Sequence, residues 1–161
     1  MRWYPYDLSM AGVGKLSLET THQVRDLCLC LHIQRAARAL ARRFDEALRP
    51  MGLTNGQFSL LMSLNRPEPA GMAAVASLLA MDRTTLTAAL KPLRRRRLVA
   101  ISRDPVDGRG RRMSLTRKGR ALLVRAFPVW KRTHAAVEAL LGEGEPARLR
   151  NTLHSLSRTA R

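Results

Sequence analysis

The sequence predicts a mainly helical chain that carries one small β-hairpin. The 161 residues are enough for one domain with one core. Leu and Ala are abundant and aromatic residues make up only 4%, which favours helices over a β-sandwich. Apolar residues recur at three- and four-residue steps along most of the chain, and only residues 98–115 have the alternation and turn residues typical of paired strands.

The first helix is predicted over residues 21–49. Residues 1–20 show no clear periodicity, and we expect a flexible N-terminal arm there. From Thr21 onward, apolar residues lie on one face of a single long helix, which Pro50 and Gly52 end.

Two short helices and a turn follow a second predicted helix. That second helix begins after Thr54, which forms a capping box with Gln57 three residues later. Residues 73–79 then form a short helix, and Asp82 is a good N-cap for the next one, over 83–96. We therefore predict a helix-turn-helix, whose second helix carries a basic and hydroxyl-bearing outer face and a kink at Pro92.

A β-hairpin and two more helices complete the chain. Strands are predicted over 98–102 and 111–115, around a loop rich in turn-forming residues. Helices are predicted over about 117–141, with a kink at Pro128, and over 146–159. A hairpin directly after a helix-turn-helix is a wing, so residues 50–118 are predicted to be a winged helix-turn-helix domain.

The formal net charge of +17 is concentrated on this domain. Between Arg83 and Lys118, twelve Lys or Arg accompany two Asp, which leaves +10 in that window. Such a concentration indicates a polyanionic partner; nucleic acid is the leading candidate and an acidic membrane surface the other. No apolar run is long enough to span a membrane or to form a secretory signal after Arg2, so we expect a cytoplasmic protein.

Four segments, in this order, resemble the MarR family of bacterial transcription regulators: LTNGQFSLLMSL, VASLLAMDRTTLTAALKPLRRRRLV, DPVDGRGRRMSLT and TRKGRALL. With the flanking helices, the resemblance covers residues 21–160. It implies a homodimer built from residues 21–49 and 119–161, which binds a pseudo-palindromic operator in double-stranded DNA. It also implies a repressor that a small aromatic or other organic molecule releases, and neither an enzyme nor a protein with a cofactor.

The resemblance also implies which residues contact DNA. The helix over 83–96 would enter the major groove, and the wing would place Arg109 of a D-x-R pattern in the minor groove, with Asp107 orienting it. Threonine hydroxyls and methyls can meet base edges, and an arginine suits a narrow, electronegative minor groove. The expected contacts are Arg83, Thr84, Thr85, Thr87, Lys91, Arg94, Arg95, Arg109 and Arg111.

The run of four arginines departs from the family pattern. Arg94 replaces an acidic residue, and Arg97 replaces a glycine that would end the helix in a left-handed conformation. Arginine at positive φ costs about 1 kcal/mol relative to glycine, so either the turn differs or Arg97 accepts that strain. The added charge should strengthen non-specific phosphate binding, and an architectural, non-specific DNA-binding protein is therefore an alternative function.

Two cysteines raise a second alternative, a peroxide-sensing regulator. One branch of the family senses organic hydroperoxides through a cysteine in the first helix. Counted back from Thr54 without gaps, Cys30 falls at that position, but the string Leu27-Cys28-Leu29 also resembles the segment, so Cys28 and Cys30 are both candidate redox residues. Tyrosine hydroxyls bond the sulfur in that branch, whereas the corresponding positions here hold Gln34, Phe44 and Asn55. On one helix Cys28 and Cys30 would point about 200° apart, so we expect neither a shared disulfide nor a shared metal ion. We interpret both as small buried hydrophobes.

The sequence offers four candidate residues for a ligand pocket and no pattern of an enzyme site. Candidate residues for an effector pocket are His32, Phe58, Met62 and Trp130, although each is more often part of a core. The sequence has no nucleophile–base pattern, no phosphate-binding glycine loop and no paired carboxylates in a suitable context. We therefore predict no catalytic residue and no metal site.

Overall fold

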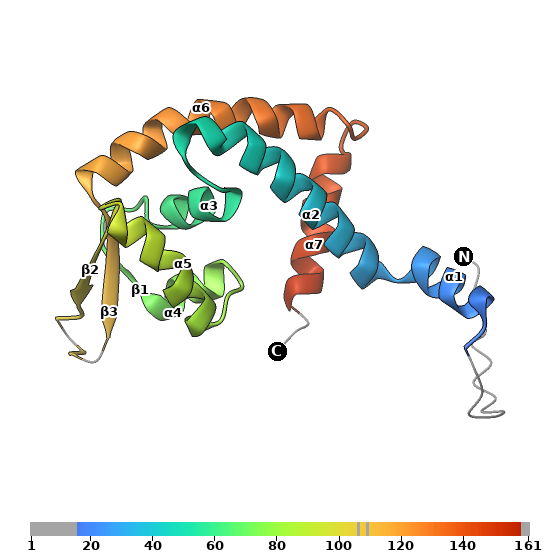
Figure 1. Ribbon diagram of the computed structural model, residues 1–161, viewed down its shortest axis with the longest axis horizontal. Coiled ribbons are helices and arrows are strands. Elements are labelled where there is room, and N and C mark those ends of the chain that lie inside the picture. The colour runs from blue at the N-terminus through green and yellow to red at the C-terminus, as the bar shows by residue number, and fades with distance from the viewer. Residues whose placement is uncertain (1–15, 106, 109, 159–161) are drawn as a thin grey trace. The chain divides into compact units, whose positions relative to one another are not determined.

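The computed structural model describes residues 16–105, 107–108 and 110–158. The chain divides into two compact units, residues 1–38 and 39–161, and each is considered by itself. Helices make up most of the described residues, and three short strands form one antiparallel sheet. The predicted class, mainly α with a small β-wing, is confirmed (Figure 1).

Two helices, α1 (Leu18–Leu27) and α2 (Leu29–Leu48), occupy the region predicted to be one helix. The side chain of Ser17 caps α1 by accepting a hydrogen bond from the backbone N–H of Thr20. The helical part of the chain therefore begins three residues before the predicted start at Thr21.

The prediction of one continuous helix is wrong at Cys28. The backbone of Cys28 is extended, with ψ 102°, and its thiol accepts a hydrogen bond from the backbone N–H of Leu31 at 3.5 Å. His32 in α2 forms a hydrogen bond with the end of α1 across the break: its Nε2 lies 3.1 Å from the carbonyl oxygen of Asp26. Cys28 and Cys30 do not follow the angular spacing of one helix, so the argument that they must point apart does not apply.

The end of α2 is the first buried part of the second unit. Phe44 and Leu48 are buried, and the chain then turns through a 3-10 helix, η1 (Arg49–Met51), to Gly52. Gly52 has φ +63°, a left-handed conformation that glycine adopts without strain. Helix α3 (Asn55–Ser63) follows, and the predicted capping box at its start is confirmed.

The helix-turn-helix consists of α4 (Met72–Leu78) and α5 (Arg83–Arg95). Asp82 caps α5 as predicted, by accepting from the backbone N–H of Thr85. Helix α5 continues through Pro92 and buries its apolar face, which consists of Leu86, Leu90 and Leu93. The opposite face of α5 is consequently left to solvent.

The sheet has the order β1-β3-β2. Strands β2 (Val99–Arg103) and β3 (Arg111–Leu115) form the predicted hairpin, with Ile101 opposite Met113. The sequence analysis did not predict β1 (Ala70–Gly71), which pairs with the other edge of β3. A segment of two residues that follows Pro69 is too short to show the alternation of apolar and polar residues that predicts a strand.

Helices α6 (Arg117–Glu138) and α7 (Glu145–Arg158) end the chain close to their predicted bounds. Thr116 caps α6, which continues through Pro128 without a break. The turn between the two helices includes Gly144 at φ +75°.

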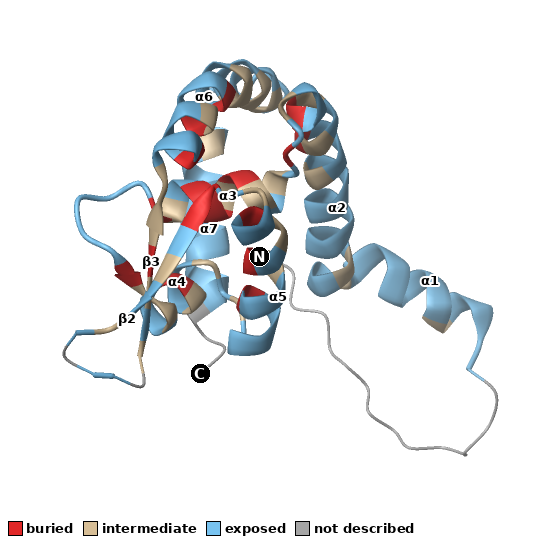
Figure 2. Ribbon diagram, turned by 60° about the vertical axis from the view of Figure 1, so that its left-hand side comes forward, coloured by how far each residue is buried: buried red, intermediate tan, exposed pale blue. Residues whose placement is uncertain are grey.

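The hydrophobic core lies in the second unit, among α3, α5, the sheet and the first half of α6 (Figure 2). Its fully buried side chains include Leu61, Leu86 and Met113. Helix α1 has no buried residue, and Leu149, Leu153 and Leu156 along α7 are exposed. The core thus supports the helix-turn-helix and its wing, while two helices leave apolar surface uncovered.

Arg97 carries the strain that the sequence analysis anticipated, since its φ is +58°. We predict that Arg97→Gly is more stable than Arg97→Ala by about 1 kcal/mol, because both variants lose the charge and only glycine relieves the positive φ. Urea denaturation of the two variants measures this difference in the free energy of unfolding. Equal values would show that the turn is not strained.

Gly119 lets α6 approach the start of the wing. A Cβ on Gly119 would lie 2.0 Å from the carbonyl oxygen of Leu98, so Gly119→Ala must move backbone. We expect a loss of about 1–3 kcal/mol of unfolding free energy, measured by thermal or chemical denaturation. Gly56→Ala in α3 is the control, because a Cβ there meets nothing within 4 Å. A Gly119→Ala variant as stable as that control would contradict the prediction.

Candidate nucleic-acid interface

The outer face of α5 presents the predicted DNA contacts to solvent. Arg83, Thr84, Lys91 and the other predicted contacts that the structure describes are all exposed. Arg109 lies outside the described residues, so the minor-groove contact expected of it stays a prediction. The exposed face and the buried leucine face of α5 follow from the same helical periodicity.

Two of the threonines already use their hydroxyl hydrogens within α5. Thr85 Oγ1 donates to the Asp82 carboxylate at 2.8 Å, and Thr87 Oγ1 donates to the carbonyl oxygen of Arg83 at 2.7 Å. The hydrogen bonds from the Thr85 backbone and side chain hold the pKa of Asp82 below its ordinary value. Thr85 and Thr87 therefore offer methyl groups and oxygen lone pairs, which suit thymine methyls or base amino groups.

A surface hollow of about 270 Å³ lies between α5 and the wing strand β3. Its polar lining consists of Arg83, Thr87, Lys91, Arg94 and Arg111, above the apolar residues Met72, Leu90 and Ile101. Five of the predicted contacts are thus brought together from two elements, whereas Thr84, Thr85 and Arg95 do not line the hollow. Four cationic side chains around one hollow are suited to the phosphate oxygens of a nucleic acid.

Asp104 organises the loop at the end of the wing, and the sequence analysis missed it. Its carboxylate accepts from Arg112 Nε at 2.8 Å, which raises the pKa of Arg112. Its backbone N–H donates to Gly110, whose own N–H donates to Asp107. The Asp-Pro dipeptide at 104–105 is the only local signal, and it marks a turn without revealing a partner eight residues away.

Asp107 was predicted to orient Arg109. The backbone N–H of Asp107 lies 3.4 Å from the Asp104 carboxylate, and its carbonyl accepts from Gly110 at 2.7 Å. These contacts place Asp107 in the wing loop. The pairing with Arg109 stays a prediction.

Three of the four candidate pocket residues line one cavity between α3, α4 and α6. Phe58, Met62 and Trp130 share this cavity of about 400 Å³ with Phe127. The Trp130 ring stacks on both phenylalanines, with centroids 6.0 Å and 5.9 Å apart. His32 is not among the lining residues, and it meets Asp26 within the first unit instead.

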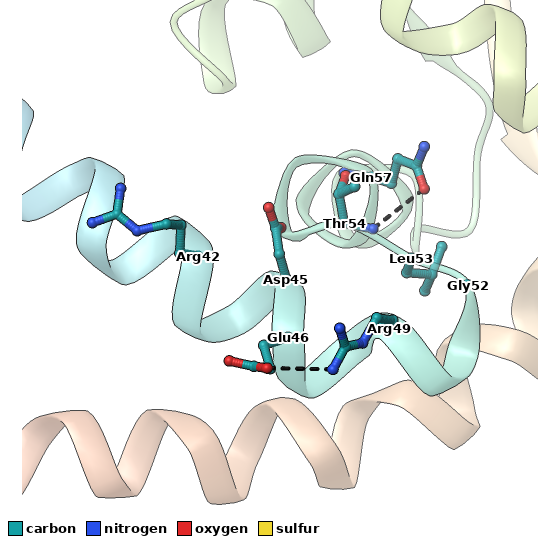
Figure 3. A pocket seen from close by; sticks show the side chains of 8 residues that line it. All are labelled: Arg42, Asp45, Glu46, Arg49, Gly52, Leu53, Thr54 and Gln57. Carbon is teal, nitrogen blue, oxygen red and sulfur yellow. Dashed lines mark hydrogen bonds and ion pairs between the residues drawn. The ribbon is translucent and has the colours of Figure 1, made fainter.

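A polar surface hollow lies where α2 turns into α3 (Figure 3). Glu46 at the end of α2 and Arg49 of η1 form an exposed ion pair at 3.3 Å along one side of it. Asp45 accepts a hydrogen bond from the backbone N–H of Asn55 at 2.6 Å, which secures the first turn of α3. The hydrogen bond from Asn55 to Asp45 thus fastens α3 to α2.

The described residues show no group of three ligating side chains that could hold a metal ion. The interpretation of both cysteines as small buried hydrophobes is wrong, because Cys30 is exposed and accepts a hydrogen bond from Gln34 at 3.1 Å, and Cys28 is only half-buried at the helix break. In the same described part of the chain, no helix is long and apolar enough to cross a membrane.

Comparison with known proteins gives consistent results. The profile of the MarR family matches residues 53–110. The transcriptional regulator SarZ of Staphylococcus epidermidis is 24% identical over 103 residues, which are 64% of this chain and 68% of SarZ. The M. tuberculosis transcriptional regulator MosR, solved in complex with DNA, is 40% identical with a TM-score of 0.75, over 83% of this chain and 96% of MosR. The repressor CouR, solved on a 23-mer DNA duplex, is 28% identical with a TM-score of 0.74, over 89% of this chain and 99% of CouR.

Asp104→Asn tests whether the wing loop must be held in place. Loss of a negative charge should by itself strengthen DNA binding, but we expect binding about tenfold weaker because the loop loses its ion pair with Arg112 and keeps at most a weaker neutral hydrogen bond. Glu68→Gln is the matched control, because Glu68 is an exposed carboxylate whose charge also acts on Arg112. Titrations at fixed ionic strength measure both affinities, and equal strengthening in the two variants would contradict a role for the loop.

Proposed function

Because the chain belongs to the MarR family of transcriptional regulators, we propose that it is a homodimeric repressor that a small organic ligand releases from DNA. Membership confirms the predicted family and the prediction that the chain is not an enzyme. The observation that carries the DNA-binding part of the proposal is the basic hollow between α5 and β3.

Binding to a specific DNA site is supported by the shape and charge of α5. An exposed helix suits the width of the major groove, and side chains near its N-terminus, such as Thr84 and Thr87, can reach base edges. Lys91, Arg94 and Arg111 are then expected to hold the backbone phosphates that fix the register. MosR has been solved in complex with DNA.

Homodimerisation is supported by the apolar surface of the first and last helices. Leu18, Val24 and Leu27 of α1 are more than half exposed. Leu149, Leu153 and Leu156 recur at helical spacing on α7 and are also exposed. Exposed apolar surface of this kind marks an interface, and a second copy covering both helices gives the expected dimerisation regions, 21–49 and 119–161.

Release by a ligand is proposed for the cavity between α3, α4 and α6. The side chains of Phe58, Met62 and Trp130 suit a small organic molecule with an aromatic face. A ligand at this position would act only if it binds one arrangement of the two DNA-reading heads better than the other.

A non-specific architectural role is the second candidate, and the run Arg94–Arg97 favours it. Three of these side chains are exposed, and each adds charge that acts on any DNA sequence. This alternative predicts a steep salt dependence with little sequence preference. The peroxide-sensing alternative lacks such support, because both tyrosines of the chain precede residue 16 and the thiol of Cys30 bonds the Gln34 amide.

Selection of bound duplexes from a random DNA pool tests the proposal. We expect one enriched pseudo-palindromic sequence that the protein still binds near physiological salt. Small molecules are then screened for the ability to release the protein from this duplex. Thr87→Ala should change which bases are enriched. Lys91→Gln should instead weaken binding to all sequences and lower the salt slope, the dependence of log affinity on log salt concentration, by about one. Enrichment of no sequence, with equal affinity for random DNA, would support the architectural role instead.

A further inference from the structure

Arg96 differs from its three arginine neighbours. Arg94, Arg95 and Arg97 are exposed, whereas Arg96 is half-buried. Its guanidinium donates to the carbonyl oxygen of Gly52 at 2.5 Å and to that of Met51 at 3.5 Å. One member of the basic run is therefore bonded to backbone 44 residues earlier in the chain.

The turn that Arg96 contacts joins α2 to α3, and Figure 3 shows Gly52 within it. The N–H groups of Gly52 and Leu53 donate back to carbonyls at the end of α2 and in η1. Such a helix end leaves later carbonyls in need of donors, and Arg96 supplies two. A Cβ at Gly52 would lie 3.3 Å from Arg96 Nη2, so glycine leaves the space that the guanidinium uses.

Arg96 is also the C-terminal cap of α5, and its backbone N–H donates to the carbonyl of Pro92 at 3.1 Å. Its side chain therefore connects the end of α5 directly to η1 and Gly52, in the turn that follows α2. Along the chain the same two points are separated by α3 and α4.

We propose that Arg96 is a positioning residue that sets which spacing of DNA half-sites the protein accepts. The inference rests on the proposed function, in which α2 belongs to the dimerisation region and α5 reads DNA. A dimer grips two half-sites whose separation must equal that of its two reading helices. Without this link α5 keeps its buried leucine face but loses one of its contacts with the turn after α2, and the dimer then tolerates a wrong separation.

The test uses the full-length protein and the duplex that wild type selects from the random pool. Companion duplexes carry one base pair more or fewer between the half-sites. We expect wild type to lose about tenfold in affinity on them, the size of one poorly placed base pair. Arg96→Gln should lose only about twofold, and its salt slope should equal that of wild type because Arg96 holds no phosphate.

Arg95→Gln is the matched contrast, because it removes the neighbouring exposed arginine. It should lower the salt slope by about one and keep the wild-type loss on wrongly spaced duplexes. The proposal is overturned if Arg96→Gln lowers the slope like Arg95→Gln, or if it weakens every spacing equally. If wild type selects no sequence, the proposed function itself fails.

Gly52→Asn tests the same contact from the other side and is used if Arg96→Gln does not fold. Asparagine tolerates the left-handed backbone, but its Cβ crowds Arg96 Nη2. We expect the same relaxed spacing, and in the double variant with Arg96→Gln no further relaxation. Wild-type discrimination in a folded Gly52→Asn variant would contradict the proposal.

Discussion

The carbonyl oxygen of Leu98 is the point on which the DNA-reading part of the molecule depends. The backbone N–H of Thr116 donates to it at 3.1 Å, the Thr116 hydroxyl donates to the neighbouring carbonyl of Arg97 at 2.7 Å, and Gly119 packs directly against the Leu98 oxygen. The N–H of Leu98 in turn bonds to Leu93 of α5. The end of α5, the start of the wing and the first turn of α6 are thus fixed together, so the wing cannot move without the helix beside it.

Much of this fold follows from local signals. Capping residues such as Thr54 and Asp82 marked helix starts, because the hydrogen bonds they make lie within one turn. The break at Cys28 could not be predicted in the same way, since apolar spacing runs through it and the contact of His32 with Asp26 spans six residues. Strand β1 was missed because a two-residue strand exists only through its partner.

The sequence predicted the position of a site residue where helical periodicity determines which face it lies on. It did not predict positions that depend on a partner far away in the chain. Helical spacing placed Lys91 and Thr87 on the exposed face of α5. The pairing of Asp104 with Arg112, and of Arg96 with Gly52, depends on how separate elements meet. In the sequence, the four arginines at 94–97 look equivalent. In the structure, Arg96 is hydrogen-bonded to Gly52 and the other three side chains are exposed to solvent.

Arg97 combines an exposed charge with a strained backbone, and both properties matter for a protein that binds DNA. A glycine at φ +58° would be relaxed, and the arginine there exchanges fold stability for one more exposed charge. Exposed charge lengthens the time spent on random DNA and permits sliding between encounters. Under the proposed function, the strained turn would therefore exchange some resistance to unfolding for a longer stay of the protein on DNA that is not its target.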